Sequence, residues 1–282
     1  MMPAPLWLLI FVVFLFGLVI GSFLNVCIYR LPRGESVVTP RSHCPKCNKP
    51  VAAYDNIPLL SYVLLGGKCR HCRTRISPVY FCVELATGLV FAYLFSIFGI
   101  TAEFAKFAVF GALMIVLVMT DWQTRLLPDR VTFPGMAFGL VFSQLVPVGD
   151  GAGGLLAGVA GFAEIPWRAA SLFDALLGAV AGGGLLYVLG ELYFRLRHKE
   201  GMGLGDVKMM AMAGFFLGPK LVLLTIWFAS IAGALIGGGL ILIFRKDWRA
   251  YEIPFGSFLG VAALAAAIWG NALLKWYLGR IL

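Results

Sequence analysis

The stretch LWLLIFVVFLFGLVIGSFLNVCI, residues 6–28, carries no charged side chain and is long enough to cross a lipid bilayer as one helix. The whole chain has 282 residues, of which 60% are hydrophobic and 13% are charged. A water-soluble domain of this size does not need so much apolar surface. The composition therefore indicates a protein that crosses the membrane several times.

Basic residues follow this first apolar run instead of preceding it. From Arg30 to Arg75 there are nine Lys or Arg residues and two acids, Glu35 and Asp55. A cleaved signal peptide carries its positive charge before the apolar segment, so the sequence predicts a retained first span. Because Lys and Arg beside a span mark the cytoplasmic side, this segment is predicted inside and the N-terminus outside. We expect no nucleic-acid partner, since the membrane accounts for the charge.

Apolar runs along the rest of the chain predict an all-α polytopic membrane protein with about eight transmembrane helices. The run 207–218 is too short to span a bilayer alone at 1.5 Å per residue. A crossing there is nevertheless needed if the cluster of Arg245, Lys246 and Arg249 is to lie inside, and both termini then lie outside. The eight runs are 6–28, 79–100, 104–120, 131–148, 172–194, 207–218, 221–244 and 254–274.

The predicted organisation has three parts: a first span over 1–29, a cytoplasmic four-cysteine domain over 30–78 and a membrane-embedded part over 79–282. The glycine-rich stretch 147–167 is predicted to be an external loop. The pair Gly17 and Gly21 favours close packing of the first span on another helix.

Four cysteines form two CxxC pairs, CPKC (Cys44, Cys47) and CRHC (Cys69, Cys72), separated by 21 residues. Such spacing lets each pair face one ion, and two pairs complete a tetrahedral thiolate site. Disulfides are the alternative, but the predicted cytoplasmic location is reducing. The sequence therefore predicts a small zinc-ribbon-like domain between spans 1 and 2 whose Zn²⁺ is structural, because four thiolates leave no open position.

Three aspartates stand at predicted cytoplasmic ends of spans. Asp121 directly follows an apolar run, Asp129 begins the next one, and Asp206 ends the segment GMGLGD. A carboxylate at the membrane edge costs free energy, so each of the three positions needs an explanation. The common level of the three residues predicts that they can converge.

Each of these residues also has a purely structural explanation. Asp129 is well placed to begin a helix, and Asp121 can pair with Arg125 one turn further on. Asp206 can cap the helix that follows it, and Lys208 can be an ordinary anchor on the cytoplasmic side.

The glycines of GMGLGDVK, residues 201–208, raise the question of a phosphate-binding loop. A dinucleotide-binding loop follows a β-strand, and a P-loop ends in G-K-[ST]; neither feature is present. Glycines permit close approach of the backbone, and here they bring an aspartate close. The stretch therefore indicates a carboxylate site.

In this order along the chain, the motifs GSFLNVCIYRLPRGES (residues 21–36), CPKC, DNIPLLSYVLLGGKCRHC (55–72), VELATG (83–88), DWQTRLLPD (121–129), GMGLGDVK and IPFGSFLG (253–260) resemble the bacterial type IV prepilin peptidases. These are intramembrane aspartic proteases of the GxGD type, and many are also N-methyltransferases. One departure is visible: Val79 and Phe81 stand where the family usually has Arg and Pro.

The resemblance implies a role for several residues. The catalytic pair falls on Asp121 and Asp206, and a glycine associated with methyl transfer falls on Gly67. The zinc ligands fall on Cys44, Cys47, Cys69 and Cys72. The supporting or substrate-binding candidates are Asp129, Gly203, Gly205 and Lys208.

The resemblance also implies the activity. The substrates are prepilins or pseudopilins in the lipid bilayer, cleaved at the cytoplasmic face of the bacterial inner membrane by a two-aspartate mechanism. The new N-terminus is then methylated from S-adenosylmethionine. A transporter or proton relay with a zinc-binding loop is the alternative, although relay carboxylates are usually strung through the spans.

Overall fold

A computed structural model describes residues 5–149, 151, 165–199, 201–237, 239 and 254–280. Most of the predicted external loop and the cluster of Arg245, Lys246 and Arg249 lie outside these residues. Two isolated β-bridges are the only extended pairing in the described part. The main helices are α1 (Leu6–Arg30), α2 (Leu60–Leu64), α3 (Val79–Phe98), α4 (Ala102–Thr124), α5 (Asp129–Ser143), α7 (Trp167–Ala179), α8 (Leu185–Arg197), α9 (Leu204–Ala232) and α11 (Phe255–Leu278).

Six helical segments in the described residues are long and apolar enough to cross a membrane. This confirms the predicted all-α polytopic class. The six are Leu6–Arg33, Pro78–Phe98, Ala102–Thr124, Trp167–Arg197, Leu204–Ile236 and Phe255–Tyr277. The number is below eight for two reasons: α5 has only 15 residues, and α9 contains two of the predicted runs.

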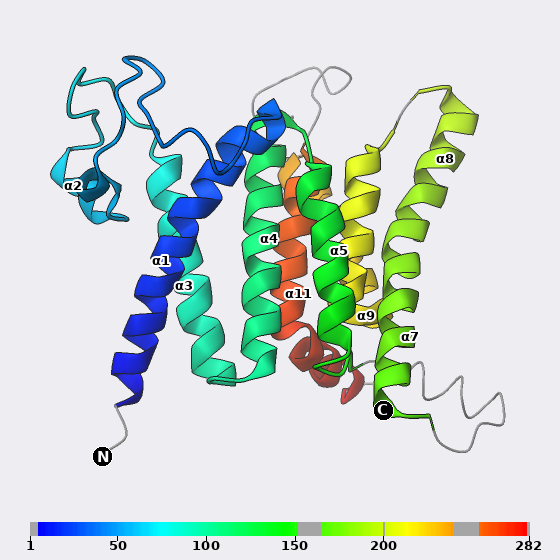
Figure 1. The fold of residues 1–282 in the computed structure, drawn as a ribbon. Helices are drawn as coiled ribbons and strands as arrows, with labels where there is room; N and C mark the ends of the chain where they lie inside the picture. Colours follow the sequence, from blue (N-terminus) through cyan, green and yellow to red (C-terminus); the bar gives the residue numbers. More distant parts are fainter. Residues whose placement is uncertain are drawn as a thin grey trace. The chain divides into compact units, whose positions relative to one another are not determined.

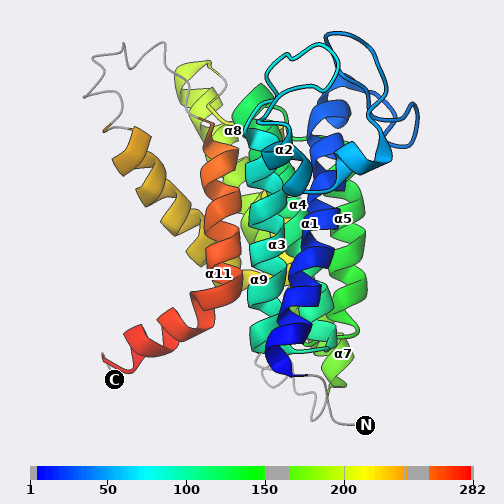
Figure 2. The ribbon, with the colours of Figure 1, turned by 90° about the vertical axis from the view of Figure 1, so that its left-hand side faces the viewer.

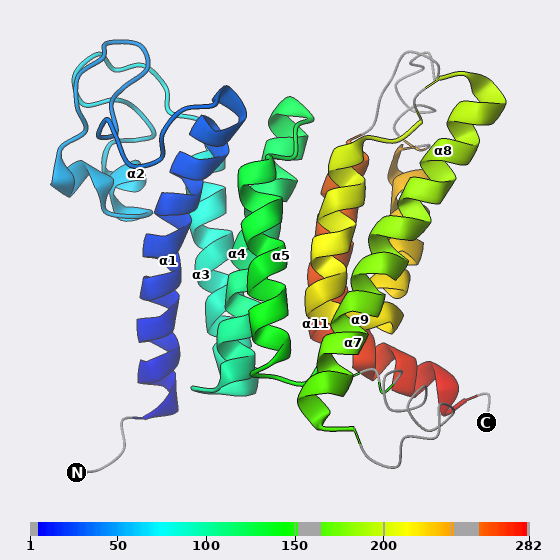
Figure 3. The same cartoon turned by 45° about the vertical axis from the view of Figure 1, so that its right-hand side comes forward.

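A sharp break divides α9 in two. Gly218 has φ 77° and ψ 176°, a conformation that favours glycine, and Pro219 follows it. In Figure 3 the first segment, 204–217, leads away from the loop after α8. In Figure 2 the second segment (gold) returns to the end from which α11 starts. The short run 207–218 is thus a helical segment of its own, as the charge pattern predicted, and its crossing of the membrane stays a prediction.

The chain forms two compact units, Met1–Val116 and Leu117–Leu282. In the first unit α1 packs on α3 through small residues. A Cβ atom on Gly17 would lie 2.8 Å from the Cα of Gly88, and one on Gly21 would lie 2.7 Å from the Cα of Glu84. Only glycine permits this approach, which agrees with the packing predicted from the Gly17 and Gly21 pair.

In the second unit α9 contacts α5, α7 and α11. Its contact with α7 is backbone against backbone, since a Cβ atom on Gly178 would lie 2.4 Å from the carbonyl oxygen of Gly214. The π-helical turn η3 (Val180–Gly184) joins α7 to α8, and Figure 3 shows the three as one rod. This packing holds the first segment of α9, at whose start the GxGD motif lies.

Candidate active site

Asp121 lies at the end of α4 and is only 6% exposed. Its partner is Ser257 in the first turn of α11. The backbone N–H of Ser257 donates to Asp121 Oδ2 at 2.5 Å, and the hydroxyl donates to the same oxygen at 2.7 Å. The first N–H groups of a helix lack partners within the helix, so the start of α11 is a natural acceptor site for a carboxylate.

Asp206 lies in the first turn of α9 and is half-buried. The helix begins two residues earlier, at Leu204, and its N-cap is Gly203. A negative charge in the first turn is favoured by the helix dipole. Asp206 is therefore not the N-cap residue, and the capping explanation of its position is wrong.

Gly256 brings the two carboxylates together. A Cβ atom built on Gly256 would lie 2.7 Å from Asp206 Oδ1 and 3.0 Å from Asp121 Oδ2. The distance between the two carboxylate oxygens is therefore no greater than the sum of these two distances. Both carboxylates face the bare backbone at the start of α11, where any larger residue would collide with them.

The other polar residues of the two motifs form a second pair. Lys208 Nζ lies 2.8 Å from both Oδ1 and Oδ2 of Asp129. Asp129 is the first residue of α5, as predicted, and the Lys208 ammonium also lies 5.4 Å from the Phe133 ring centroid. This ion pair joins the start of α5 to the first turns of α9, on which Asp206 sits.

Of the supporting glycines, Gly205 is packed and Gly203 is not. A Cβ atom on Gly205 would lie 3.0 Å from the Cβ of Leu127, whereas one on Gly203 would meet nothing closer than 3.9 Å. Gly67 belongs to the first unit, where its φ of +63° favours glycine and a Cβ atom would lie 2.9 Å from the Tyr62 hydroxyl.

Sequence reasoning did not single out Gly256 and Ser257 as site residues. They stand in IPFGSFLG, a motif that carried the resemblance but contains no titratable group. Their contribution is a backbone position and two hydrogen-bond donors.

The four CxxC cysteines form one cluster in the first unit. One sulfur from each lies within 4.8 Å of the others, and Cys44 Sγ lies 3.7 Å from Cys72 Sγ. A Zn–S bond of about 2.3 Å places tetrahedral sulfurs about 3.8 Å apart, so the cluster fits zinc. All four are free cysteines, as the zinc interpretation requires.

The two CxxC turns have the same local geometry. Asn48 N–H donates to the Cys44 carbonyl, and Arg73 N–H donates to the Cys69 carbonyl, with φ of 54° and 58° at the two donors. The backbone N–H groups of Cys47 and then Lys46 lower the pKa of the Cys44 thiol to about 6. A lowered thiol pKa favours the thiolate form that metal ligation needs.

The fold and the site together define a helical, membrane-type protein with a paired-carboxylate centre and a four-cysteine cluster. Two family models match it: the bacterial peptidase A24 N-terminal domain over residues 15–98 and the type IV leader peptidase family over residues 108–238. The chain belongs to the type IV leader peptidase family.

Curated relatives extend the match to nearly the whole chain. A prepilin leader peptidase/N-methyltransferase of Aeromonas salmonicida is 35% identical over 98% of this chain and 96% of the relative. Proteins of the same name from Pseudomonas aeruginosa and Bacillus subtilis are 33% and 31% identical, over 94% and 95% of this chain and 91% and 97% of the relatives. No solved structure matches the chain significantly.

Proposed function

We propose that the protein removes the leader peptide from type IV prepilins or pseudopilins and N-methylates the new N-terminal residue. The observation that carries the peptidase activity is the convergence of Asp121 and Asp206 on the backbone of Gly256. Membership of the leader peptidase family and the names of the curated relatives support both activities.

Two carboxylates held this close do not readily ionise together, so they share one proton. The N–H and O–H donors of Ser257 stabilise a negative charge on Asp121. Asp121 is therefore the base in this proposal, and Asp206 is the acid that hydrogen-bonds the scissile carbonyl oxygen.

The proposed reaction is a direct hydrolysis. Asp121 takes a proton from water as the water oxygen bonds to the carbonyl carbon, and Asp206 donates its proton to the carbonyl oxygen. When the C–N bond breaks, the amine leaves with the proton held by Asp121. Asp206 recovers its own proton as the new carboxyl group forms.

The proposed location is the inner membrane of a bacterium, with the active site at the cytoplasmic face and both termini outside. Arg125, Arg130 and Lys208 lie near the two carboxylates in sequence, which the positive-inside rule favours for a cytoplasmic end. The apolar helix of the prepilin would lie in the bilayer, with its leader junction at this end.

Two groups complete the proposal. Cys44, Cys47, Cys69 and Cys72 would hold a structural Zn²⁺. S-adenosylmethionine would supply a methyl group carried on a positively charged sulfur.

Mass spectrometry of a prepilin co-expressed with this protein tests the proposed function. We expect the product to lack the leader and to carry the mass of one added methyl group. A cleaved product with an unmethylated N-terminus would contradict the proposed methyltransferase activity. An intact prepilin in cells that contain the folded protein would contradict the proposed peptidase activity.

Metal analysis of the purified, reduced protein is expected to find about one zinc per chain. Cys44→Ser should lose the metal and unfold the small segment around it, because that segment has little core of its own. Cys82→Ser is the matched control, since Cys82 is free and outside the cluster, and it should keep the metal. Metal-free wild-type protein would contradict the zinc assignment.

Asp129→Asn is expected to have only a small effect on the rate of prepilin cleavage. The side chains of Lys208 and Asp129 are 34% and 52% exposed, and ion pairs at such positions contribute about 0.2–1 kcal/mol. Cleavage rates should therefore fall only several-fold, and adding Lys208→Met should cause little further loss. An inactive Asp129→Asn beside an active Asp121→Asn would mean that the other aspartate of the motif is the catalytic one.

A further inference from the structure

A cavity of about 460 Å³ lies in the first unit, and none of its lining residues is assigned to cleavage. This volume is in the usual range of about 300–1,000 Å³ for small-molecule sites. Its walls come from α1, from the cysteine-containing segment and from the start of α3. The lining combines aromatic rings with charges of both signs, which offers partners to a ligand that carries both charges. The charged side chains are Asp55, Glu84, Arg30, Lys49, Arg70 and Arg75, and two cysteines of the cluster, Cys44 and Cys69, also line the cavity.

Glu84 of α3 is one of the two carboxylates that line the cavity. It is 9% exposed, and its Oε2 accepts a hydrogen bond from the backbone N–H of Leu59 at 2.8 Å. Leu59 holds φ at 58°, which is costly for a residue with a side chain. Gly21 packs directly on the Cα of Glu84, which fixes the backbone of α3 there, and the Leu59 N–H orients the carboxylate.

No Lys or Arg in the described part of the chain forms an ion pair with Glu84. A buried carboxylate is costly unless a positive charge compensates it. Because Glu84 faces a cavity, a positively charged ligand can supply this compensation.

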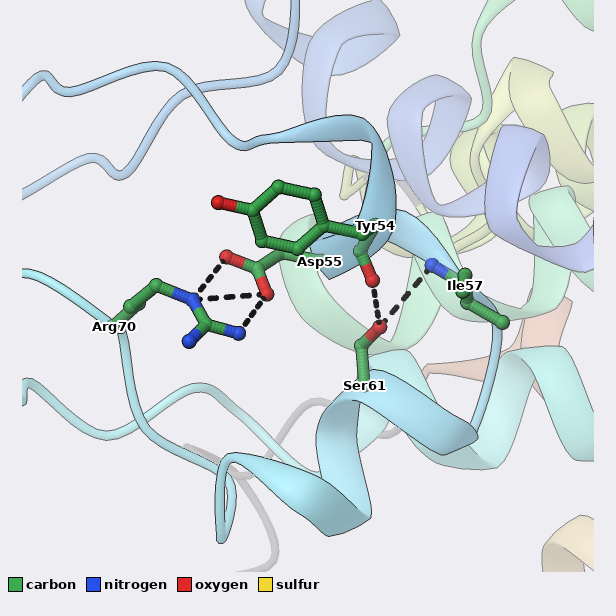
Figure 4. A network of polar contacts seen from close by, with 5 residues as sticks. All are labelled: Tyr54, Asp55, Ile57, Ser61 and Arg70. Atoms are coloured by element: carbon green, nitrogen blue, oxygen red, sulfur yellow. Dashed lines mark hydrogen bonds and ion pairs between the residues drawn. The ribbon is translucent and has the colours of Figure 1, made fainter.

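The second carboxylate in the lining, Asp55, is already paired with a cation. Figure 4 shows Asp55 held by Arg70, whose Nε lies 2.8 Å from Asp55 Oδ2. This contact lowers the pKa of Asp55, so the carboxylate stays ionised at neutral pH. Ser61 stabilises the same turn, because its hydroxyl donates a hydrogen bond to the Tyr54 carbonyl and accepts one from the Ile57 N–H.

Aromatic side chains add apolar faces to the lining of the cavity. The rings of Tyr62 and Phe81 are 5.6 Å apart, and Tyr80 also lines the cavity. Aromatic faces suit both a nucleobase and a cation. An ionised carboxylate can accept the hydroxyl groups of a ribose.

We propose that this cavity binds the methyl donor, S-adenosylmethionine, and that Glu84 is the counter-charge to its sulfonium group. The proposal rests on the N-methyltransferase activity proposed above. It accounts for a tightly fixed, buried carboxylate without a cationic partner in a cavity of ligand size. The competing explanation is structural: Glu84 only anchors the Leu59 turn.

The charge of the ligand separates the two explanations. S-adenosylmethionine carries a positive sulfur, whereas S-adenosylhomocysteine has a neutral one and is otherwise the same apart from the methyl group. Glu84→Gln keeps an acceptor for the Leu59 N–H but removes the negative charge. Loss of the counter-charge should weaken the binding of S-adenosylmethionine only. Distortion of the Leu59 turn should weaken the binding of both ligands.

Calorimetric binding of both ligands to the purified full-length protein tests the proposal. We expect the wild-type protein to bind both ligands. Glu84→Gln should lower the affinity for S-adenosylmethionine by at least about tenfold and the affinity for S-adenosylhomocysteine by at most about twofold. Glu35→Gln, an exposed acid outside the cavity, is the matched control and should leave both affinities unchanged. Val26→Trp should fill the cavity and weaken both ligands, with an unchanged zinc content as the sign of a folded domain.

The outcomes separate this proposal from the proposed function. Equal effects of Glu84→Gln on the two ligands, or unchanged binding in Val26→Trp, would overturn the cavity assignment. Methylation of a co-expressed prepilin by wild type would still stand. Absence of S-adenosylmethionine binding by wild type would overturn the cavity assignment too, and absence of methylated prepilin in the same cells would then remove the methyltransferase activity as well.

Discussion

Replacing Asp121 or Asp206 by asparagine is expected to lower the rate of prepilin cleavage by at least about a thousandfold. Asparagine keeps the size of the side chain but cannot take a proton from water or give one to the scissile carbonyl. In the proposed mechanism Asp121 is the base and Asp206 is the acid, so neither can take over the role of the other. The measurement is the initial rate with a purified prepilin in detergent, at matched amounts of folded enzyme.

The control for this pair is Glu191→Gln. Glu191 is an acid of the same unit on α8, where it is partly exposed and paired with Arg195. The Glu191→Gln variant should cleave prepilin at the wild-type rate. Substantial cleavage by either asparagine variant would contradict the assignment of the catalytic pair.

Gly256→Ala is expected to lower the cleavage rate by about a hundredfold while the protein still folds. The added methyl group would lie 2.7 Å from Asp206 Oδ1 and 3.0 Å from the Cγ of Asp121, both too short for a non-bonded contact. One carboxylate must therefore move, and a displacement of about 1 Å in an active site costs about that factor. The Ser257 donors are displaced with the same turn.

Gly233→Ala is the matched control for Gly256→Ala. A Cβ atom on Gly233 would lie 3.8 Å from the Phe255 ring, which is ordinary contact, and its rate should stay near that of wild type. Equal rates for the two alanine variants would show that the close approach at Gly256 is unimportant.

Much of the fold follows from local features of the sequence. The apolar runs predict the helices, and the Lys and Arg clusters predict two segments where hydropathy finds one long helix. The break at Gly218 and Pro219 is the physical reason for that difference. The CxxC spacing predicts the cysteine cluster for the same kind of reason, because the contacts within each pair are local.

The partners of the aspartates could not be predicted in this way. Ser257 and Gly256 are far from Asp121 in sequence, and neither residue type identifies a site by itself. What makes them important is that the start of α11 packs against the end of α4 in the second unit. The same holds for Glu84, whose place in the cavity wall depends on the folded contact of α3 with the cysteine-containing segment.

The central claim is that Asp121 and Asp206 act as one catalytic unit. The most direct test compares cleavage by Asp121→Asn, Asp206→Asn and the double variant, all as purified folded protein. Residues that work together lose their contribution once either is removed, so the three residual rates should be equal within a few-fold. Multiplying effects, in which the double variant is far slower than either single one, would contradict the shared mechanism.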